Sequence, residues 1–148
     1  FGLALASAGR EAVTLVEGDP ASSADLASNA EPFGPRVRVD RRSVETFLLE
    51  AGQNTSHAAK ARPCVEVATV IVDPPRTGMS KEALRGLVRA QPPHLVYVSC
   101  DIATLARDTR VLLDGGYALD GVTGIDLFPN TAHVETVVSF SREESSCV

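Results

Sequence analysis

Two carboxylates and a thiol follow apolar runs in this sequence at places where a hydrophobic core needs none of them. Glu17 comes at the end of the run AVTLV, Asp73 at the end of CVEVATVIV and Cys100 at the end of HLVYVS. Runs of this composition predict buried strands. Because ligands bind outside the carboxyl ends of the strands in open parallel sheets, we expect these side chains to share the rim of one crevice.

Cys100 is a candidate nucleophile. It stands between Ser99 and Asp101, where a strand is expected to end and a helix to begin, and helix N-termini favour the reactive thiolate. A lone cysteine is more often a small buried side chain, so that interpretation stays open. With the other two cysteines, Cys64 and Cys147, it forms no CxxC pair, so the sequence suggests neither a disulfide framework nor a metal site.

Three acids are further candidates, each with a plainer alternative. Glu17 could accept the hydroxyl groups of a nucleoside ribose, or it could help to cap the next helix. Asp73 is followed by two prolines that would fix its carboxylate beside a ligand, or it could only cap a tight turn. Glu135 shares one face of a predicted strand with His133 and could be a base, or an exposed acid that opposes edge-to-edge aggregation.

The elements that must position these residues alternate between strands and helices, which predicts an α/β fold with a parallel sheet and helices on both faces. Helices are expected at 1–9, 20–34, 43–52, 80–91 and 101–116. Strands are expected at 12–19, 36–40, 64–73, 94–100, 117–128 and 133–141, and the last two are expected to pair as an antiparallel hairpin at the sheet edge. The polar stretch 53–63 is expected to be a surface loop.

Composition limits the partners. The 148 residues, 44% of them hydrophobic, suit one compact domain, and no apolar stretch has the length of a membrane span, so we expect a cytoplasmic protein without a membrane partner. The net charge of -5 is unusual for a chain that binds nucleic acid by itself. Its one notable basic cluster is RVRVDRR (36–42), so most contacts to any RNA should come from outside this chain.

The motifs DPPRTG (73–78), VYVSCD (96–101), TLARD (104–108) and DLFPNTAHVE (126–135), with a GY pair between the last two, follow one another in an order that resembles the RNA 5-methyluridine (uracil-C5) methyltransferase family. The resemblance extends from Phe1 to Phe140. It implies a class I S-adenosylmethionine-dependent methyltransferase fold, a Rossmann-like three-layer sandwich whose mostly parallel sheet has an antiparallel C-terminal edge hairpin. The family's first strand and glycine loop would precede Phe1.

The resemblance also implies roles for single residues. Cys100 would be the nucleophile, Glu135 the base, and Glu17 and Asp73 would bind the cofactor S-adenosylmethionine, with no metal. Residues 1–148 would form the single catalytic domain of a longer enzyme, C-terminal to an RNA-binding region. The substrate would be a loop uridine of tRNA or ribosomal RNA, which must leave its stack to react, and no DNA partner is expected.

The chain departs from the family pattern at three positions. Asp101 stands where Asn is usual, Asn130 where Gln is usual, and Ser43 where many relatives have an acid near the adenine. Three other functions come into question. An amino-group nucleic-acid methyltransferase also uses Asp-Pro-Pro, but with an aromatic residue where Arg76 stands, and a 5-methylcytosine enzyme would have a cysteine there. A non-catalytic Rossmann-like binding domain is the third possibility, although it would not need both Cys100 and Glu135.

Overall fold

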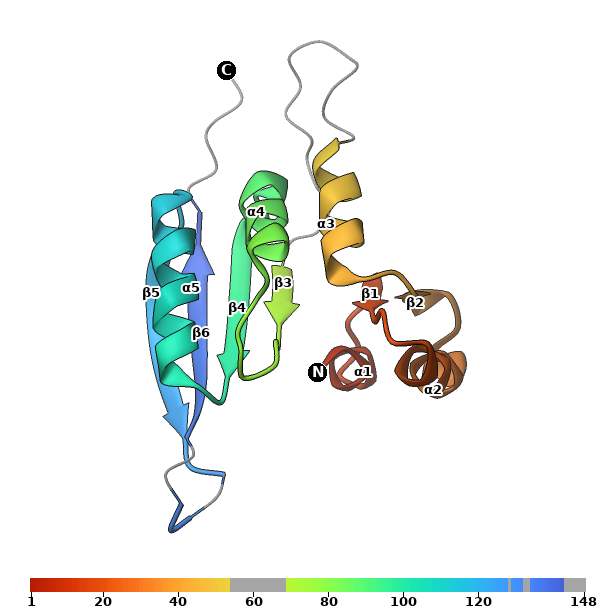
Figure 1. The fold of residues 1–148 in the computed structure, drawn as a ribbon. Coiled ribbons are helices and arrows are strands. Elements are labelled where there is room, and N and C mark those ends of the chain that lie inside the picture. Colours follow the sequence, from red (N-terminus) through yellow and green to blue (C-terminus); the bar gives the residue numbers. More distant parts are fainter. Residues whose placement is uncertain (54–68, 128, 132–133, 143–148) are drawn as a thin grey trace. The chain divides into compact units, whose positions relative to one another are not determined.

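The chain folds into two compact units, Phe1–Glu50 and Ala51–Val148 (Figure 1). The computed structural model describes residues 1–53, 69–127, 129–131 and 134–142. The predicted loop at 53–63, the beginning of the predicted strand 64–73 and His133 therefore lie largely or wholly outside the described residues. No helix among the described residues is both long and apolar enough to cross a membrane.

The N-terminal unit contains a parallel pair of strands. Its elements are α1 (Gly2–Ser7), β1 (Val13–Val16), α2 (Pro20–Ala30), the 3-10 helix η1 (Glu31–Arg36), β2 (Val37–Asp40) and the beginning of α3 (Val44–Gln53). The register of β1 with β2 runs from Val13 opposite Val37 to Val16 opposite Asp40. A small core of Ala6, Ala30 and Val37 forms where α1, α2 and β2 meet.

The second unit contains a four-stranded sheet. Its elements are β3 (Thr69–Val72), α4 (Lys81–Ala90), β4 (His94–Ser99), α5 (Ile102–Asp114), β5 (Ala118–Ile125) and β6 (Glu135–Ser141). The strand order is β3-β4-β6-β5, with β3 and β4 parallel and the other two pairings antiparallel. The predicted antiparallel hairpin at the sheet edge is therefore confirmed.

Side-chain caps explain where the helices begin. Asp19, Ser43, Ser80 and Asp101 each accept a hydrogen bond from the backbone N–H three residues later, at 2.8 to 3.2 Å. Such bonds satisfy N–H groups that the first turn of a helix leaves unpaired. The predicted helix 20–34 ends earlier, at Ala30, because Pro32, Pro35 and the positive φ of Gly34 (54°) convert its end into η1.

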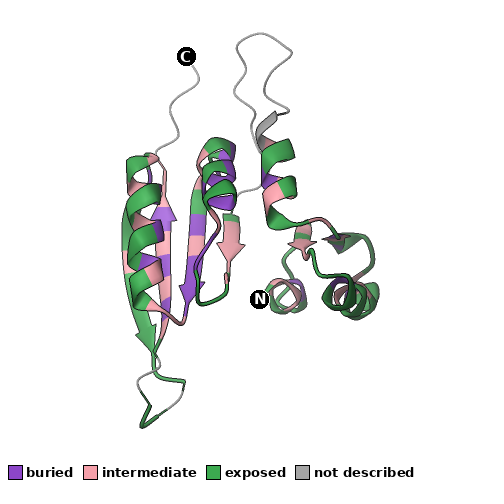
Figure 2. Ribbon diagram, in the orientation of Figure 1, coloured by how far each residue is buried: buried purple, intermediate pink, exposed green. Residues whose placement is uncertain are grey.

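Helices α4 and α5 cover one face of the four-stranded sheet (Figure 1). The side chains of Leu95 and Tyr97 in β4, and of Phe140 in β6, are at most 1% exposed, and α4 adds Leu84 and Leu87 to this core. Figure 2 shows the buried residues concentrated in β4, β6 and α4. Apolar burial of this kind contributes about 1.5 to 3 kcal/mol for each large side chain, which makes the sheet a firm support for residues at its ends.

Candidate active site

Three of the four residues singled out in the sequence lie at the same end of the four-stranded sheet, the end at which β3 and β4 finish. Asp73 comes directly after β3, Cys100 directly after β4, and Glu135 is the first residue of β6. Strands β3 and β4 run in the same direction and β6 runs antiparallel to β4. The C-terminal ends of β3 and β4 and the start of β6 therefore lie at the same end of the sheet. The expectation that Glu17, Asp73 and Cys100 directly follow strands is confirmed, and the expectation that they share the rim of one crevice stays a prediction.

Cys100 and Glu135 flank the last residue pair between β4 and β6. That pair is Ser99 with Thr136, and the strands of a sheet lie about 4.8 Å apart. If the register continued by one residue, Cys100 would come level with Glu135. In the parallel pair, Val72 lies beside Tyr97, so Asp73 lies level with the residue two positions before Cys100.

Strand alternation predicts that all three side chains lie on the face of the sheet that α4 and α5 do not cover. Tyr97 points toward α5, because its hydroxyl donates a hydrogen bond of 2.6 Å to Asp108 in that helix. Side chains alternate along a strand, so the alternation from Tyr97, continued past the end of β4, predicts that Cys100 points to the opposite face. Continued in the same way, the register predicts that face for Asp73 and Glu135.

A short hydrogen-bonded turn fixes the backbone around Cys100. The Ser99 hydroxyl accepts from the Asp101 N–H at 3.1 Å and donates to the Asp101 carbonyl at 3.0 Å. Hydrogen bonds from the backbone and side chain of Thr104 lower the pKa of Asp101, so this cap of α5 stays ionised below the ordinary range of an aspartate. Cys100 itself is partly buried.

Glu17 belongs to the N-terminal unit, at the carboxyl end of β1. Its backbone N–H donates to the Asp40 carbonyl at 3.1 Å, and its carboxylate accepts from the Asp19 N–H at 2.8 Å. Gly18 follows where a Cβ would come within 2.9 Å of the Ser43 Cα, so the chain needs glycine there. The bond from the Asp19 N–H is the one expected if Glu17 helps to cap α2. The second carboxylate oxygen of Glu17 accepts no hydrogen bond among those described.

The sequence analysis missed a buried carboxylate. Asp108 of α5 is 0% exposed and accepts hydrogen bonds from the Met79 N–H and from the Tyr97 hydroxyl. A signal was present, because Asp108 occupies the helical position between Leu105 and Leu112 on the buried face of α5. Within the described part of the chain, no group of three or more His, Cys, Asp or Glu residues could bind a metal ion.

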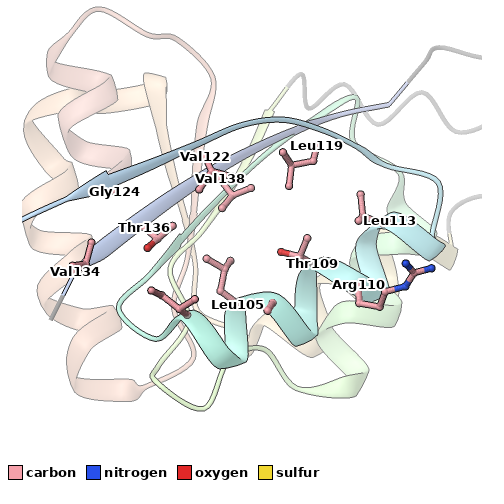
Figure 3. Close-up of a pocket in the computed structure, with 12 residues that line it drawn as sticks. Leu105, Thr109, Arg110, Leu113, Leu119, Val122, Gly124, Val134, Thr136 and Val138 are labelled. Carbon is pink, nitrogen blue, oxygen red and sulfur yellow. The ribbon is translucent and has the colours of Figure 1, made fainter. Parts of the chain in front are cut away.

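A cavity of about 480 Å³ opens between α5 and the β5–β6 hairpin, on the other face of the sheet (Figure 3). Its lining is apolar apart from Thr109, Arg110 and Thr136 and contains neither an acid nor a thiol; the other lining residues are Ile102, Leu105, Ala106, Leu113, Leu119, Val122, Gly124, Val134 and Val138. Asp73, Cys100 and Glu135 are not among the residues that line this cavity. It offers no groups for the predicted chemistry.

Comparison with known proteins agrees with the motifs. The family model described as tRNA (Uracil-5-)-methyltransferase matches residues 63–143. An uncharacterized RNA methyltransferase of Clostridium acetobutylicum is 49% identical over 108 residues, which are 72% of this chain and 24% of that protein. One of Bacillus cereus is 50% identical over 76 residues, which are 51% of this chain and 16% of that protein. The chain thus spans a quarter or less of these two relatives.

Solved structures give the fold. The tRNA (uracil-54, C5)-methyltransferase of Pyrococcus abyssi, in complex with S-adenosyl-L-homocysteine, superposes with a TM-score of 0.71 at 30% identity over 95% of this chain and 31% of that one. A putative RNA methyltransferase of Pyrococcus horikoshii superposes with a TM-score of 0.58 at 20% identity, over 90% of this chain and 63% of that one. The class I methyltransferase fold implied by the motifs is confirmed.

Proposed function

The chain belongs to the tRNA (uracil-5-)-methyltransferase family, and from this premise we propose that it transfers a methyl group from S-adenosylmethionine to carbon 5 of a uridine in tRNA or ribosomal RNA. One observation carries the proposal: the β4–β6 register ends with Ser99 opposite Thr136, so Cys100 and Glu135 flank this last pair at the same end of the two strands. A thiol and a carboxylate facing one base are what this reaction requires.

Cys100 supplies the nucleophile. Carbon 5 of uracil is a poor nucleophile, but addition of the Cys100 thiolate to carbon 6 forms a carbon–sulfur bond and turns carbon 5 into an enolate carbon. That carbon would then bond to the methyl group as the bond between methyl and sulfonium sulfur breaks, and S-adenosylhomocysteine would leave. The turn that Ser99 makes with Asp101 keeps the thiol at the sheet edge during this step.

Glu135 completes the reaction. After methyl transfer, carbon 5 carries both a methyl group and a hydrogen. The Glu135 carboxylate removes that proton, the carbon 5–carbon 6 double bond forms again, and the carbon–sulfur bond breaks to release the Cys100 thiolate. Glu135 is the first residue of β6 and Cys100 directly follows β4, its antiparallel neighbour, which supports this pairing of roles.

The two remaining acids suit the cofactor. S-adenosylmethionine supplies an electrophilic methyl group when bound. Glu17 lies at the carboxyl end of a parallel strand, where carboxylates accept ribose hydroxyls. Asp73 is exposed at the end of β3, and the two prolines after it limit the backbone conformations that it can adopt. We assign both residues to cofactor binding, each from its place at a strand end of its own unit.

The substrate is an unpaired loop uridine. A uracil inside a duplex stack cannot present carbon 6 to a thiol at the end of a strand, so the base must be turned out before Cys100 reacts. The acidic net charge of -5 supplies little attraction for phosphates. The choice of RNA therefore depends on contacts made by more of the protein than these residues.

A covalent trap tests the proposal. The complete gene product that carries these residues is incubated with S-adenosylmethionine and tRNA or ribosomal RNA transcripts that contain 5-fluorouridine. Fluorine at carbon 5 cannot leave as a proton, so a complex that survives denaturing electrophoresis should accumulate. Cys100→Ala should abolish it, and Cys147→Ala, the matched cysteine control, should not. Absence of a complex with every transcript would overturn the proposal, as would a complex that survives Cys100→Ala.

A further inference from the structure

The loop that follows Asp73 is attached to α5 through a buried carboxylate. Asp108 Oδ2 accepts from the Met79 N–H at 2.8 Å and from the Tyr97 hydroxyl at 2.6 Å. Burial and the hydrogen bond to Asp108 raise the pKa of Tyr97 far above its ordinary value, so its hydroxyl stays protonated and donates. Asp108 thereby joins β4, α5 and the loop 73–80.

Two more residues of α5 contact the same loop. Arg107 donates to the Thr77 carbonyl at 3.0 Å and to the Met79 carbonyl at 3.3 Å, and it also pairs with Asp108 at 2.8 Å. Thr104, one helical turn earlier, donates to the Arg76 carbonyl at 3.0 Å. Residues three and four apart lie on the same face of a helix, so Thr104, Arg107 and Asp108 act on the loop together.

Gly78 lets the loop approach the helix this closely. Its φ of +75° is strained for any residue with a side chain, and a Cβ there would come within 2.5 Å of the Arg107 guanidinium and 2.7 Å of the Asp108 carboxylate. The loop also closes on itself, because the Gly78 N–H donates to the Pro75 carbonyl at 2.8 Å. The contacts therefore fix the backbone only a few residues after Asp73.

The same helix begins next to Cys100. Asp101 caps α5, and Cys100 is the residue before this cap. One rigid helix thus fixes both the cysteine at its N-terminus and, two turns later, the loop that carries Asp73. We propose that Thr104, Arg107 and Asp108, the α5 clamp, are positioning residues that set the place of Asp73 relative to Cys100 during methyl transfer. The inference rests on the proposed function of those two residues.

A positioning role has a different kinetic consequence from a purely structural one. If the clamp only stabilised the fold, the molecules that remain folded would react at the normal rate. If it sets the geometry, folded molecules should react slowly, because a displacement of about 1 Å at a reacting centre can cost about 100-fold in rate. The rate for each active molecule therefore separates the two roles.

The test uses Arg107→Ala in the complete gene product, with Arg110→Ala as the matched control. Arg107 is 54% exposed, so its removal should leave the protein folded. Arg110 lies on the same helix, is 72% exposed and pairs only with Asp114 among the ion pairs of the described residues. The fraction of competent enzyme is measured by the 5-fluorouridine trap, and single-turnover methyl transfer to ordinary uridine RNA is then measured at saturating S-adenosylmethionine.

We expect Arg107→Ala to transfer methyl at least tenfold more slowly for each competent molecule, and Arg110→Ala to stay within twofold of the unmodified enzyme. Thr104→Val, which removes one hydrogen bond to the loop, should slow transfer by a smaller factor and serves if Arg107→Ala does not fold. Equal rates for each competent molecule in Arg107→Ala and Arg110→Ala, or in Thr104→Val where it is used instead, would overturn the clamp. A missing trap in the unmodified enzyme would instead overturn the proposed function.

Discussion

The nucleophilic role assigned to Cys100 rests on the residues that surround it more than on the presence of a thiol. Ser99 closes the turn on one side, Asp101 caps the next helix on the other, and Glu135 begins the strand that pairs with β4. The sequence was sufficient to place Cys100 and Asp73, because a dense apolar run that stops at a polar residue is a strong signal for a strand end. It was not sufficient for Asp108, because helical patterning alone does not distinguish a buried acid from a solvated one.

The role of Glu135 leads to a first prediction at the scale of single residues. Glu135→Gln removes the base but keeps the size of the side chain, so methyl transfer should proceed while release of Cys100 slows by about 100-fold or more. A covalent complex should then accumulate with ordinary uridine RNA, without fluorine. Denaturing electrophoresis with labelled RNA measures it.

The matched control for this substitution is Glu82→Gln, an exposed acid in the first turn of α4 to which no catalytic role is assigned. It should turn over normally and accumulate no complex. If Glu135→Gln forms methylated product at the normal rate, Glu135 is not the base.

Among the helices, α5 makes two kinds of contact, and its amphipathic pattern predicts only one of them. Its apolar side packs against the sheet through Leu105 and Leu112, and its polar residues contact the loop after β3. The pattern predicted the helix and its buried side. Which loop it would touch depends on hydrogen bonds between residues about 30 positions apart, and no local pattern encodes them.

A substitution at Gly78 tests the close contact between the loop 73–80 and α5. Gly78→Ala combines a strained φ with close contact to Arg107 and Asp108, so we expect a loss of more than about 1 kcal/mol in the free energy of unfolding, together with slower methyl transfer. Urea unfolding and single-turnover kinetics measure the two effects.

Gly116→Ala is the matched control in the same unit. Gly116 also has a positive φ, of +90°, but a Cβ there would meet only the flexible end of Arg142, at 3.4 Å. It should lose stability through backbone strain alone and keep its rate of methyl transfer. Equal losses of stability and equal rates in the two variants would contradict the close packing assigned to Gly78.

At the scale of the whole molecule, the chain comprises two units, each with its own sheet. Sequence patterns predicted nearly every strand and helix and the antiparallel hairpin, because these follow from periodicity and turn residues. They did not predict which strands become neighbours, such as β4 beside β6, because that pairing joins residues about 40 positions apart. The proposal that residues 1–148 act as one catalytic domain stays a prediction.

The stability of the N-terminal unit should fall at low pH because of one ionised aspartate, Asp40. Hydrogen bonds from Arg42 lower the pKa of Asp40, whose side chain is 5% exposed. Because the pKa is lower in the folded state, this pair stabilises the unit above the ordinary aspartate pKa, and the contribution is lost as the pH falls through the lowered value. Asp40→Asn should therefore cost about 1.5 to 3 kcal/mol at pH 7, the usual range for a hydrogen bond to a charged group, and much less at pH 2.

Hydrogen exchange of the β1 and β2 amides between pH 7 and pH 2 measures this effect, with each rate corrected for the intrinsic dependence of exchange on pH. Asp25→Asn, at an exposed position of α2, is the matched control and should change protection little at either pH. A cost for Asp40→Asn that does not change with pH would contradict the assigned ion pair.

Mass spectrometry of the trapped complex shows whether Cys100 becomes bonded to carbon 6 of a uracil. After digestion with nuclease and protease, we expect a peptide that contains Cys100 and carries a methylated 5-fluorouridine nucleotide, with fragmentation placing the added mass on the sulfur. A nucleotide attached to Cys64 or Cys147, or methylated RNA recovered without any attached peptide, would contradict it.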